Sequence, residues 1–235
     1  MIRIEQLHKQ FGKNKVLKGI DLEITNKGVF AILGPNGSGK TTLIKALLGM
    51  VIPNKGQLVV GNENIKKNWK YRDQIDYLPQ IANFPANLTV KELIAMIKDL
   101  RNRTGEDKRL ISMFQLEPFL SKKLSNLSGG TKQKVNLVLT LMFDSPIIIL
   151  DEPTSGLDPI ALIRLKEIIA EEKAKGKIIL ITSHIMSFVE EMADEIVFLL
   201  EGKVYFKGSI EVLKIQTDES NFEHAIANLL RQEYA

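Results

Sequence analysis

Short, mostly apolar runs alternate along the chain with longer stretches in which apolar residues recur every three or four positions. A short apolar run is typical of a strand buried on both faces, and such runs lie at Val29–Leu33, Ile75–Leu78, Ile147–Leu150, Ile178–Ile181 and Glu195–Leu200. The helical period is found at Lys40–Met50, Thr89–Leu100, Ser128–Phe143 and Asp158–Gly176. Buried strands that alternate with amphipathic helices predict an α/β fold with a mostly parallel sheet.

The start of the chain follows a different pattern, because it consists of strands without helices between them. Ile2–Leu7 and Val16–Ile24 are predicted strands on either side of a turn at Gly12–Lys15, and Gln57–Val60 is a further strand. We therefore expect a small N-terminal antiparallel β-layer on one side of the parallel sheet.

A largely helical stretch interrupts the order of the strands at about residues 89–143. It opens with Thr89 followed three positions later by Glu92, which is the pattern of a capping box. We expect an inserted α-helical subdomain here, and a helical tail at about residues 209–235. The whole chain, residues 1–235, is then a single domain.

Composition narrows the class of protein. The chain has 235 residues, of which 44% are hydrophobic and 26% are charged, and it has no cysteine. Disulfides and thiolate metal sites are thereby excluded. The apolar runs are far shorter than the roughly twenty residues of a membrane-spanning helix, and Met1–Glu5 alternates like a strand rather than a signal peptide. A net charge of +4 is too small to indicate a nucleic-acid partner, so we expect a cytoplasmic enzyme or ATPase.

Gly34 to Thr41 fits the pattern G-x-x-x-x-G-K-[ST] at every fixed position, between a predicted strand and a predicted helix. Glycines let backbone N–H groups surround an anion, and the helix N-terminus adds partial positive charge. In such a loop the lysine reaches the β- and γ-phosphates and the hydroxyl residue binds Mg²⁺. The predicted phosphate loop of a P-loop NTPase consists of Gly34, Pro35, Asn36, Gly37, Ser38, Gly39, Lys40, Thr41 and Thr42.

Two adjacent carboxylates, Asp151 and Glu152, end the predicted strand Ile147–Leu150. A carboxylate at a buried strand end requires compensation, so a cation or a bound water is expected beside it. Asp151 suits Mg²⁺, and Glu152 suits a general base that activates the attacking water. A GTPase is disfavoured because none of the Asn-Lys dipeptides has aspartate two residues on, and no aspartate has glycine three residues on.

Leu127 to Lys134 reads Leu-Ser-Gly-Gly-Thr-Lys-Gln-Lys, and Ser128 stands where it can cap the following helix. This segment resembles the signature motif of ATP-binding-cassette (ABC) ATPases, in which L-S-G-G-x-x-Q precedes a basic residue. The resemblance implies that a partner protomer's ATP is contacted by Ser128, Gly129, Gly130 and Gln133. Lys134 departs from the arginine that is frequent in the family, so the charge is kept while bidentate geometry is lost.

The remaining family motifs follow in order over essentially the whole chain. The resemblance implies that Phe11 stacks on adenine, that Gln80 contacts Mg²⁺ and links the site to a partner, and that His184 touches the γ-phosphate. Asp158 matches the loop that crosses the dimer interface, and it also stands at a helix N-cap. The alternative for Phe11 is an aromatic residue of the core at a strand end. The alternative for His184 is an ordinary polar residue of a loop.

The resemblance implies ATP hydrolysis with Mg²⁺ by a head-to-tail dimer of cassettes, and we expect the second cassette to be an identical chain. A bare cassette resembles the ATPase subunit of a transporter whose membrane-spanning subunit is a separate chain, so we expect a peripheral location on the cytoplasmic face of the membrane. Residues 75–89 and 201–209 resemble exporter ATPases, among them the copper-processing type that serves nitrous oxide reductase maturation. A soluble assembly ATPase and a non-hydrolysing nucleotide-gated module are the alternatives.

Overall fold

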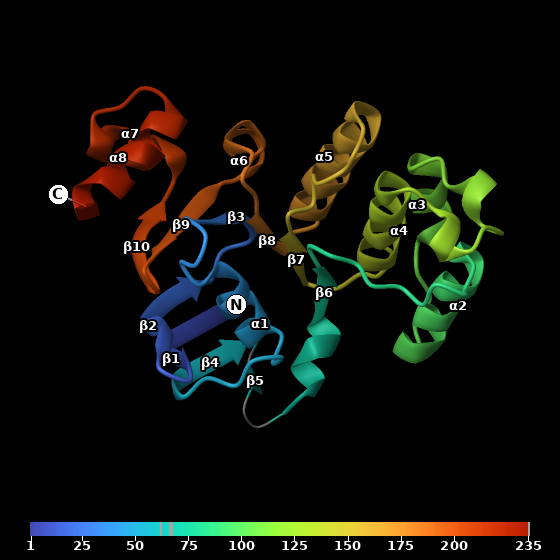
Figure 1. Cartoon of the computed structure of the whole chain (residues 1–235), viewed down its shortest axis with the longest axis horizontal. Coiled ribbons are helices and arrows are strands. Elements are labelled where there is room, and N and C mark those ends of the chain that lie inside the picture. Colours follow the sequence, from blue (N-terminus) through green and yellow to red (C-terminus); the bar gives the residue numbers. More distant parts are fainter. Residues whose placement is uncertain (62, 66–67, 235) are drawn as a thin grey trace.

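A computed structural model of the chain describes residues 1–61, 63–65 and 68–234. Ten strands form two sheets in this part of the chain (Figure 1). The four-stranded sheet has the order β2-β1-β4-β5 and is antiparallel throughout. Its strands are β1 (Ile2–Phe11), β2 (Asn14–Ile24), β4 (Lys55–Val60) and β5 (Glu63–Asn64). The expected N-terminal antiparallel layer is confirmed.

The six-stranded sheet has the order β10-β9-β3-β8-β7-β6, and all its pairs are parallel except β9 with β10. The strands are β3 (Gly28–Leu33), β6 (Ile75–Leu78), β7 (Ile147–Asp151), β8 (Ile178–Thr182), β9 (Glu195–Leu200) and β10 (Lys203–Gly208). Every residue of β3, β7 and β8 is buried, as expected for central parallel strands covered on both faces. The predicted mostly parallel α/β sheet is confirmed.

Alternate residues of these strands pack into different hydrophobic cores, one on each face of the sheet. Ile147 and Ile149 face the antiparallel sheet and α1 (Lys40–Leu47), whereas Ile148 and Leu150 pack toward the helices of the opposite face. Those helices are α2 (Val90–Arg101), α3 (Asp107–Met113), α4 (Gly129–Leu141), α5 (Pro159–Ala174) and α6 (Met186–Met192). The last two helices, α7 (Ile210–Thr217) and α8 (Phe222–Tyr234), cover β9 and β10.

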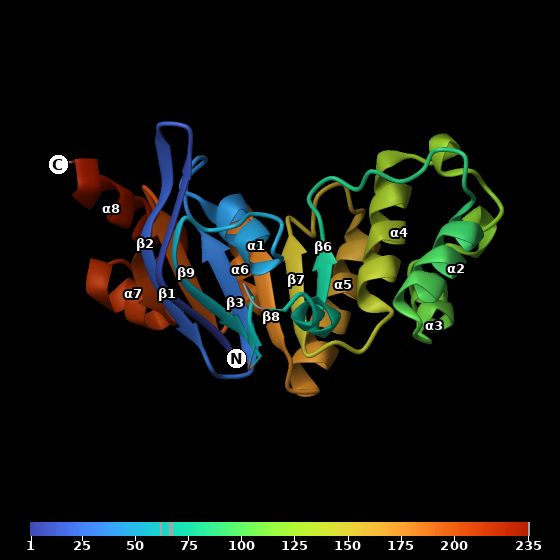
Figure 2. The same ribbon diagram turned by 90° about the horizontal axis from the view of Figure 1, so that it is seen from below.

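Residues between β6 and β7 carry α2, α3 and α4, which stand apart from the antiparallel sheet at the other end of the molecule (Figure 2). Thr89 caps α2 with both hydrogen bonds of a capping box. The expected tail ends at Ala235, which lies outside the described residues. None of the helices in the described ranges has the length and apolar character needed to cross a bilayer.

Two predicted boundaries are wrong for local reasons. The helix predicted to reach Met50 ends at Leu47, because Gly49 adopts a φ of +66° and the N–H of Met50 bonds back to the carbonyl of Lys45. The turn predicted at Gly12–Lys15 is shorter, since Gly12 has a φ of +57° and lets β1 and β2 run up to a tight hairpin.

Candidate nucleotide-binding site

The loops that follow four parallel strands meet at one edge of the sheet. Asp151 at the end of β7 is in register with Thr182 at the end of β8, which pairs in turn with Ile32 near the end of β3. The carboxyl ends of parallel strands form the usual ligand crevice of α/β folds. A cavity of about 260 Å³ lies there, lined by Asn14, Val16, Asn36, Gly37, Gly39, Lys40, Thr41, Thr42, Gln80, Asp151, Glu152, Thr182 and His184.

The loop after β3 wraps tightly because of its glycines. Gly34 has a φ of +143°, and a Cβ there would lie 2.0 Å from the carbonyl oxygen of Leu199. The Oγ of Ser38 is buried with no hydrogen-bond partner among the described residues. Such an orphaned hydroxyl inside a glycine cradle, at the start of α1, suits a phosphate group.

Lys40 points back into this loop. Its Nζ donates hydrogen bonds to the carbonyl oxygens of Gly34, at 2.7 Å, and Pro35, at 3.1 Å. Burial lowers the pKa of Lys40, while the nearby charges of Glu152 and Asp151 oppose that shift. The ammonium is thus held close to the cradle, beside two carboxylates.

Asp151 is 5% exposed and its Oδ1 accepts a hydrogen bond from the Thr182 hydroxyl at 2.5 Å. Burial, together with the negative charge of Asp151, raises the pKa of Tyr77 to about 12. Asp151, Thr41 and Gln80 line one cavity and offer a carboxylate, a hydroxyl and an amide. These are the hard oxygen ligands that Mg²⁺ prefers, so the donor set fits this ion.

Glu152 has a backbone conformation that is uncommon for a side chain of its size, with a φ of +52°. Its N–H donates to the Thr182 hydroxyl at 3.0 Å, which holds the turn in place. The Oε1 atom lies 3.2 Å from Nε2 of His184, and the His184 N–H donates to Oε2 at 3.4 Å. Strain of this kind persists where the surrounding structure fixes it, and it aims this carboxylate into the cavity.

The residues of the Ser-Gly-Gly segment do not line this cavity. Ser128 caps α4 by accepting a hydrogen bond from the N–H of Thr131 at 3.2 Å. Gly130 packs against the loop after β7, since a Cβ there would lie 2.7 Å from the carbonyl oxygen of Gly156. Gly129 has nothing within 4 Å of the position that its Cβ would take. This end of α4 is therefore open to another molecule.

Two contacts fasten α4 to the loop that follows the carboxylates. The Gln133 amide donates to the carbonyl of Pro153 at 3.3 Å. The Lys134 ammonium lies 2.6 Å from Oδ2 of Asp158, whose Oδ1 caps α5 by accepting from the N–H of Ala161. Hydrogen bonds from the Lys134 ammonium and from the backbone N–H of Ala161 lower the pKa of Asp158.

Phe11 ends β1 and is half exposed, with the Lys9 ammonium 4.7 Å above the centre of its ring. Its cross-strand partner is Asn14, which lines the cavity. The ring thus stands on the hairpin beside the cavity rather than in a hydrophobic core.

Sequence reasoning missed three residues of the cavity, namely Asn14, Val16 and Thr182. Thr182 had a readable signal, since it is the first polar residue after an apolar strand and stands opposite a predicted carboxylate. The other two have no motif, and they reach the cavity only because β2 crosses near the phosphate loop.

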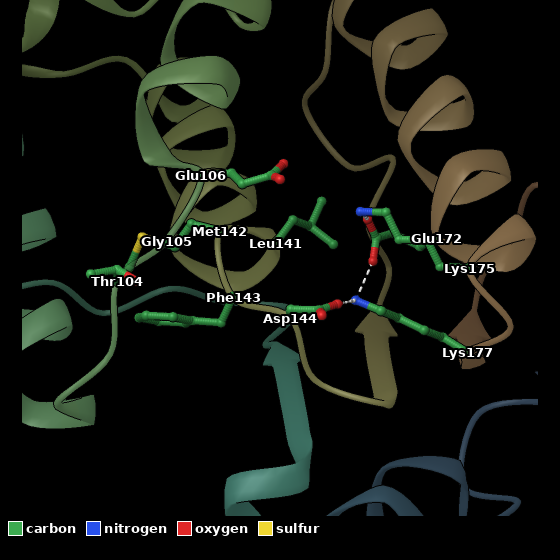
Figure 3. Close-up of a pocket in the computed structure, with 10 residues that line it drawn as sticks. All are labelled: Thr104, Gly105, Glu106, Leu141, Met142, Phe143, Asp144, Glu172, Lys175 and Lys177. Atoms are coloured by element: carbon green, nitrogen blue, oxygen red, sulfur yellow. Dashed lines mark hydrogen bonds and ion pairs between the residues drawn. The ribbon is translucent and has the colours of Figure 1, made fainter.

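A second cavity, of about 440 Å³, lies between the end of α4 and the end of α5, where α3 begins (Figure 3). Lys177, whose side chain is 7% exposed, lies there 2.7 Å from Asp144 and also pairs with Glu172. Lys175 pairs with Glu172 at 2.7 Å. The lysines and carboxylates of this cavity pair with one another, so they stabilise the packing of the chain after α4 against the end of α5. The cavity therefore does not present a set of cations arranged to bind phosphate.

Comparison with known proteins agrees with this geometry. The family model described as ABC transporter matches residues 17–155. The lantibiotic transport ATP-binding protein SrtF of Streptococcus pyogenes is 34% identical over 220 residues, which cover 87% of this chain and 89% of that protein. The Nod factor export ATP-binding protein I of Burkholderia orbicola (strain AU 1054) is 31% identical over 218 residues, covering 90% and 72%. A solved ATP-binding subunit of an ABC transporter superposes with a TM-score of 0.92 at 28% identity, covering 98% of this chain and 99% of that one.

Proposed function

The chain belongs to the ABC transporter family and is an ATP-binding, ATP-hydrolysing subunit of that family, and on that premise we propose which residues act and with what partners. The phosphate loop holds the ATP phosphates, with Lys40 on the β- and γ-phosphates and Thr42 beside them. Thr41, Asp151 and Gln80 would hold Mg²⁺, which when bound neutralises charge on the phosphate oxygens.

Glu152 is the general base in this proposal. Its carboxylate accepts the proton of the attacking water, and His184 orients the carboxylate while it contacts the γ-phosphate. The pair supports these roles because Nε2 of His184 lies 3.2 Å from Oε1 of Glu152 within the same cavity as Lys40. The adenine ring stacks on Phe11 at the hairpin, because stacking needs only an accessible ring face.

The observation that carries the assignment is the common level at which β3, β7 and β8 end. It supports a single site in which a phosphate cradle, a metal carboxylate and a base meet. The test is phosphate release from ATP and Mg²⁺ by the purified chain. A chain that binds ATP and yet releases no phosphate would contradict hydrolysis and favour a nucleotide-gated binding module.

A second copy of the chain completes the site. Ser128, Gly129 and Gly130 do not line the cavity of their own chain, and Gly129 has open space around it. We infer that they contact the γ-phosphate held by the partner, with Gln133 and Asp158 positioning that segment. The helix N-terminus of α4 adds partial positive charge that suits an anion. ATP is then bound between two protomers.

We also propose a membrane-spanning partner subunit, which places the chain peripherally on the cytoplasmic face of the membrane. The docking segment is the stretch after Gln80, because it is continuous with a residue of the nucleotide cavity. Ile81 is 74% exposed there, and a small cavity of about 140 Å³ beside Phe84 and Leu124 follows it. An amphipathic helix in such a groove is a common mode of recognition.

The absence of cysteine makes this interface easy to test. Ile81→Cys introduces a single thiol into the chain. Membranes that carry this variant are then treated with a thiol-directed crosslinker. We expect a crosslink to an integral membrane protein. The matched control is Leu100→Cys, at a side chain on α2 that is 75% exposed. Equal crosslinking from both positions, or none from Ile81→Cys, would contradict the docking segment. Phe84 is unsuitable, because it packs against the core.

Relatives named for lantibiotic transport and Nod factor export support an exporter as the assembly that this chain energises. The copper-processing type remains a prediction from residues 75–89 and 201–209. We further propose that the chain acts as one domain, with a helical subdomain at residues 89–143 and a helical tail at residues 209–235. The α2–α4 helices and the α7–α8 pair support that division.

A further inference from the structure

The β1–β2 hairpin is strongly basic. From Leu7 to Ile20 the chain has four lysines and one histidine and no carboxylate side chain. Figure 2 shows the tip of this hairpin extending past the neighbouring strands. The nucleotide site uses only one side of the hairpin, because Asn14 and Val16 line that cavity while Lys15 and Lys18 line a different one.

That different cavity, here called the hairpin groove, has a volume of about 520 Å³. It is formed by β1, β2 and the start of β4, and its lining carries four lysines, one histidine and two amides but no carboxylate. The lining residues are His8, Lys9, Gln10, Lys15, Leu17, Lys18, Asn54 and Lys55. A volume of this size is typical of a small-molecule site.

Strand register places two lysines of the groove on either side of one residue of the central strand. His8 on β1 pairs with Lys18 on β2 and with Lys55 on β4. Within the described ranges, Lys18 is the one groove lysine that has a carboxylate at ion-pair distance, namely Glu201 at 3.6 Å. The groove therefore holds positive charge that an anion would compensate.

Hydrogen bonds fix the walls of the groove. The Lys9 ammonium donates to the carbonyl of Ile52 at 2.8 Å. The N–H of Gln10 donates to Oδ1 of Asn54 at 2.8 Å, and the N–H of Asn54 donates to the carbonyl of His8 at 2.8 Å. These bonds join β1 to the start of β4, so the groove is formed before a ligand arrives and little ordering accompanies binding.

We propose that the hairpin groove binds a small soluble anion that bears two or more phosphate groups, at a site separate from the nucleotide cavity. Lysine ammoniums bind phosphate as point charges, and the amides of the groove supply neutral donors. The concave shape favours a small molecule over a flat membrane surface. Since the hairpin also carries Phe11, a bound anion would act on the wall of the adenine site.

The test uses the full chain saturated with ADP and Mg²⁺, so that the phosphate loop is already filled. Fructose 1,6-bisphosphate, a soluble bisphosphate, is titrated by calorimetry into the parent, into Lys18→Gln/Lys55→Gln, and into the control Lys91→Gln/Lys108→Gln. The control removes two exposed lysines on α2 and α3, which stand apart from the antiparallel sheet (Figure 2). We expect the groove variant to bind at least about ten-fold more weakly than the other two proteins, because it lacks two charge-assisted hydrogen bonds to phosphate. Equal affinities in all three proteins, or no binding by the parent, would overturn the proposal.

Sedimentation with vesicles separates the two sources of phosphate. Vesicles of phosphatidylcholine alone are compared with vesicles that also contain phosphatidylglycerol. Binding to the anionic vesicles without binding to the bisphosphate would overturn the assignment to a soluble ligand. Phosphate release at saturating ATP is expected to be the same in the parent and both variants. A failure of the groove proposal would therefore leave the assignment of ATPase activity unchanged.

Discussion

Both carboxylate oxygens of Glu152 contact His184. Oε1 lies 3.2 Å from the imidazole Nε2, and Oε2 accepts the backbone N–H at 3.4 Å. The two residues follow neighbouring strands, β7 and β8, whose ends are in register. The side chain of Glu152 is therefore held by both the ring and the backbone of His184, and its φ of +52° is stabilised by the Thr182 hydroxyl. This fixed orientation at the nucleotide cavity supports the proposal that Glu152 is the general base.

Glu152→Gln should hydrolyse ATP at least about 10²-fold more slowly than the parent, because the amide cannot accept the proton of the attacking water. ATP binding should survive, since Lys40 and the loop are unchanged. The substitution removes a negative charge near the γ-phosphate, so ATP and Mg²⁺ should hold two chains together. Light scattering checks this, and a variant that stays monomeric with ATP would contradict the shared site.

Lys40→Ala should bind ATP about ten- to a hundred-fold more weakly, because the phosphates lose a charge-assisted hydrogen bond. Calorimetry with ATP and Mg²⁺ measures the affinity. Lys45→Ala is a matched control on the same helix, outside the residues that line the cavity. If Lys40→Ala bound ATP with the affinity of the parent, the phosphate loop would not be part of the nucleotide site.

The Lys134–Asp158 pair should position the Ser-Gly-Gly segment rather than bind ATP within its own chain. Lys134→Met should lower kcat by about ten-fold with little change in KM, the range for a residue that acts through others. Lys134→Arg should restore the rate, because the positive charge beside Asp158 is kept. A kcat in Lys134→Met equal to that of the parent would show that the pair is only a surface contact.

Much of the site could be predicted because its motifs depend on local chemistry. A glycine loop, two carboxylates and a histidine each follow a buried strand, and parallel strands place such ends at one edge. Asp158 was predicted at a helix N-cap, and its side chain caps α5. The prediction that the Ser-Gly-Gly segment contacts the ATP of the partner protomer rests on the family resemblance. No residue pattern indicates whether a helix N-terminus binds a ligand of its own chain or of another.

The features that could not be predicted from the sequence depend on tertiary packing. Leu100 ends the predicted helical stretch Thr89–Leu100, yet its side chain is 75% exposed, so the helical period alone does not determine which apolar residues are buried. The short helix Met186–Met192 was not predicted, since seven residues are too few to show a helical period. Val16 reaches the nucleotide cavity through the crossing of β2 and the phosphate loop, which the sequence does not encode locally.

Asp76 connects pH to stability in a way that can be checked away from the nucleotide site. It lies on β6, is 1% exposed, and one carboxylate oxygen is 3.3 Å from Nη1 of Arg101. Burial raises the pKa of Asp76 to about 6 from 3.8, although the charge of Arg101 opposes the shift. Below a pH of about 4 the carboxyl is protonated in both the folded and the unfolded chain, so it contributes no pH dependence there.

As the pH rises from about 4 to about 6, the unfolded chain releases the Asp76 proton while the folded chain keeps it, so the free energy of unfolding falls. The difference between the two pKa values corresponds to roughly 3 kcal/mol that is lost above a pH of about 6. Asp76→Asn stays neutral, so its stability relative to the parent should rise by up to that amount between pH 4 and pH 7, whatever constant difference comes from replacing the carboxyl group by an amide. Urea unfolding at several pH values measures both proteins, with the exposed Asp73→Asn as control. Parallel curves for the parent and Asp76→Asn would show that burial does not hold this carboxyl protonated.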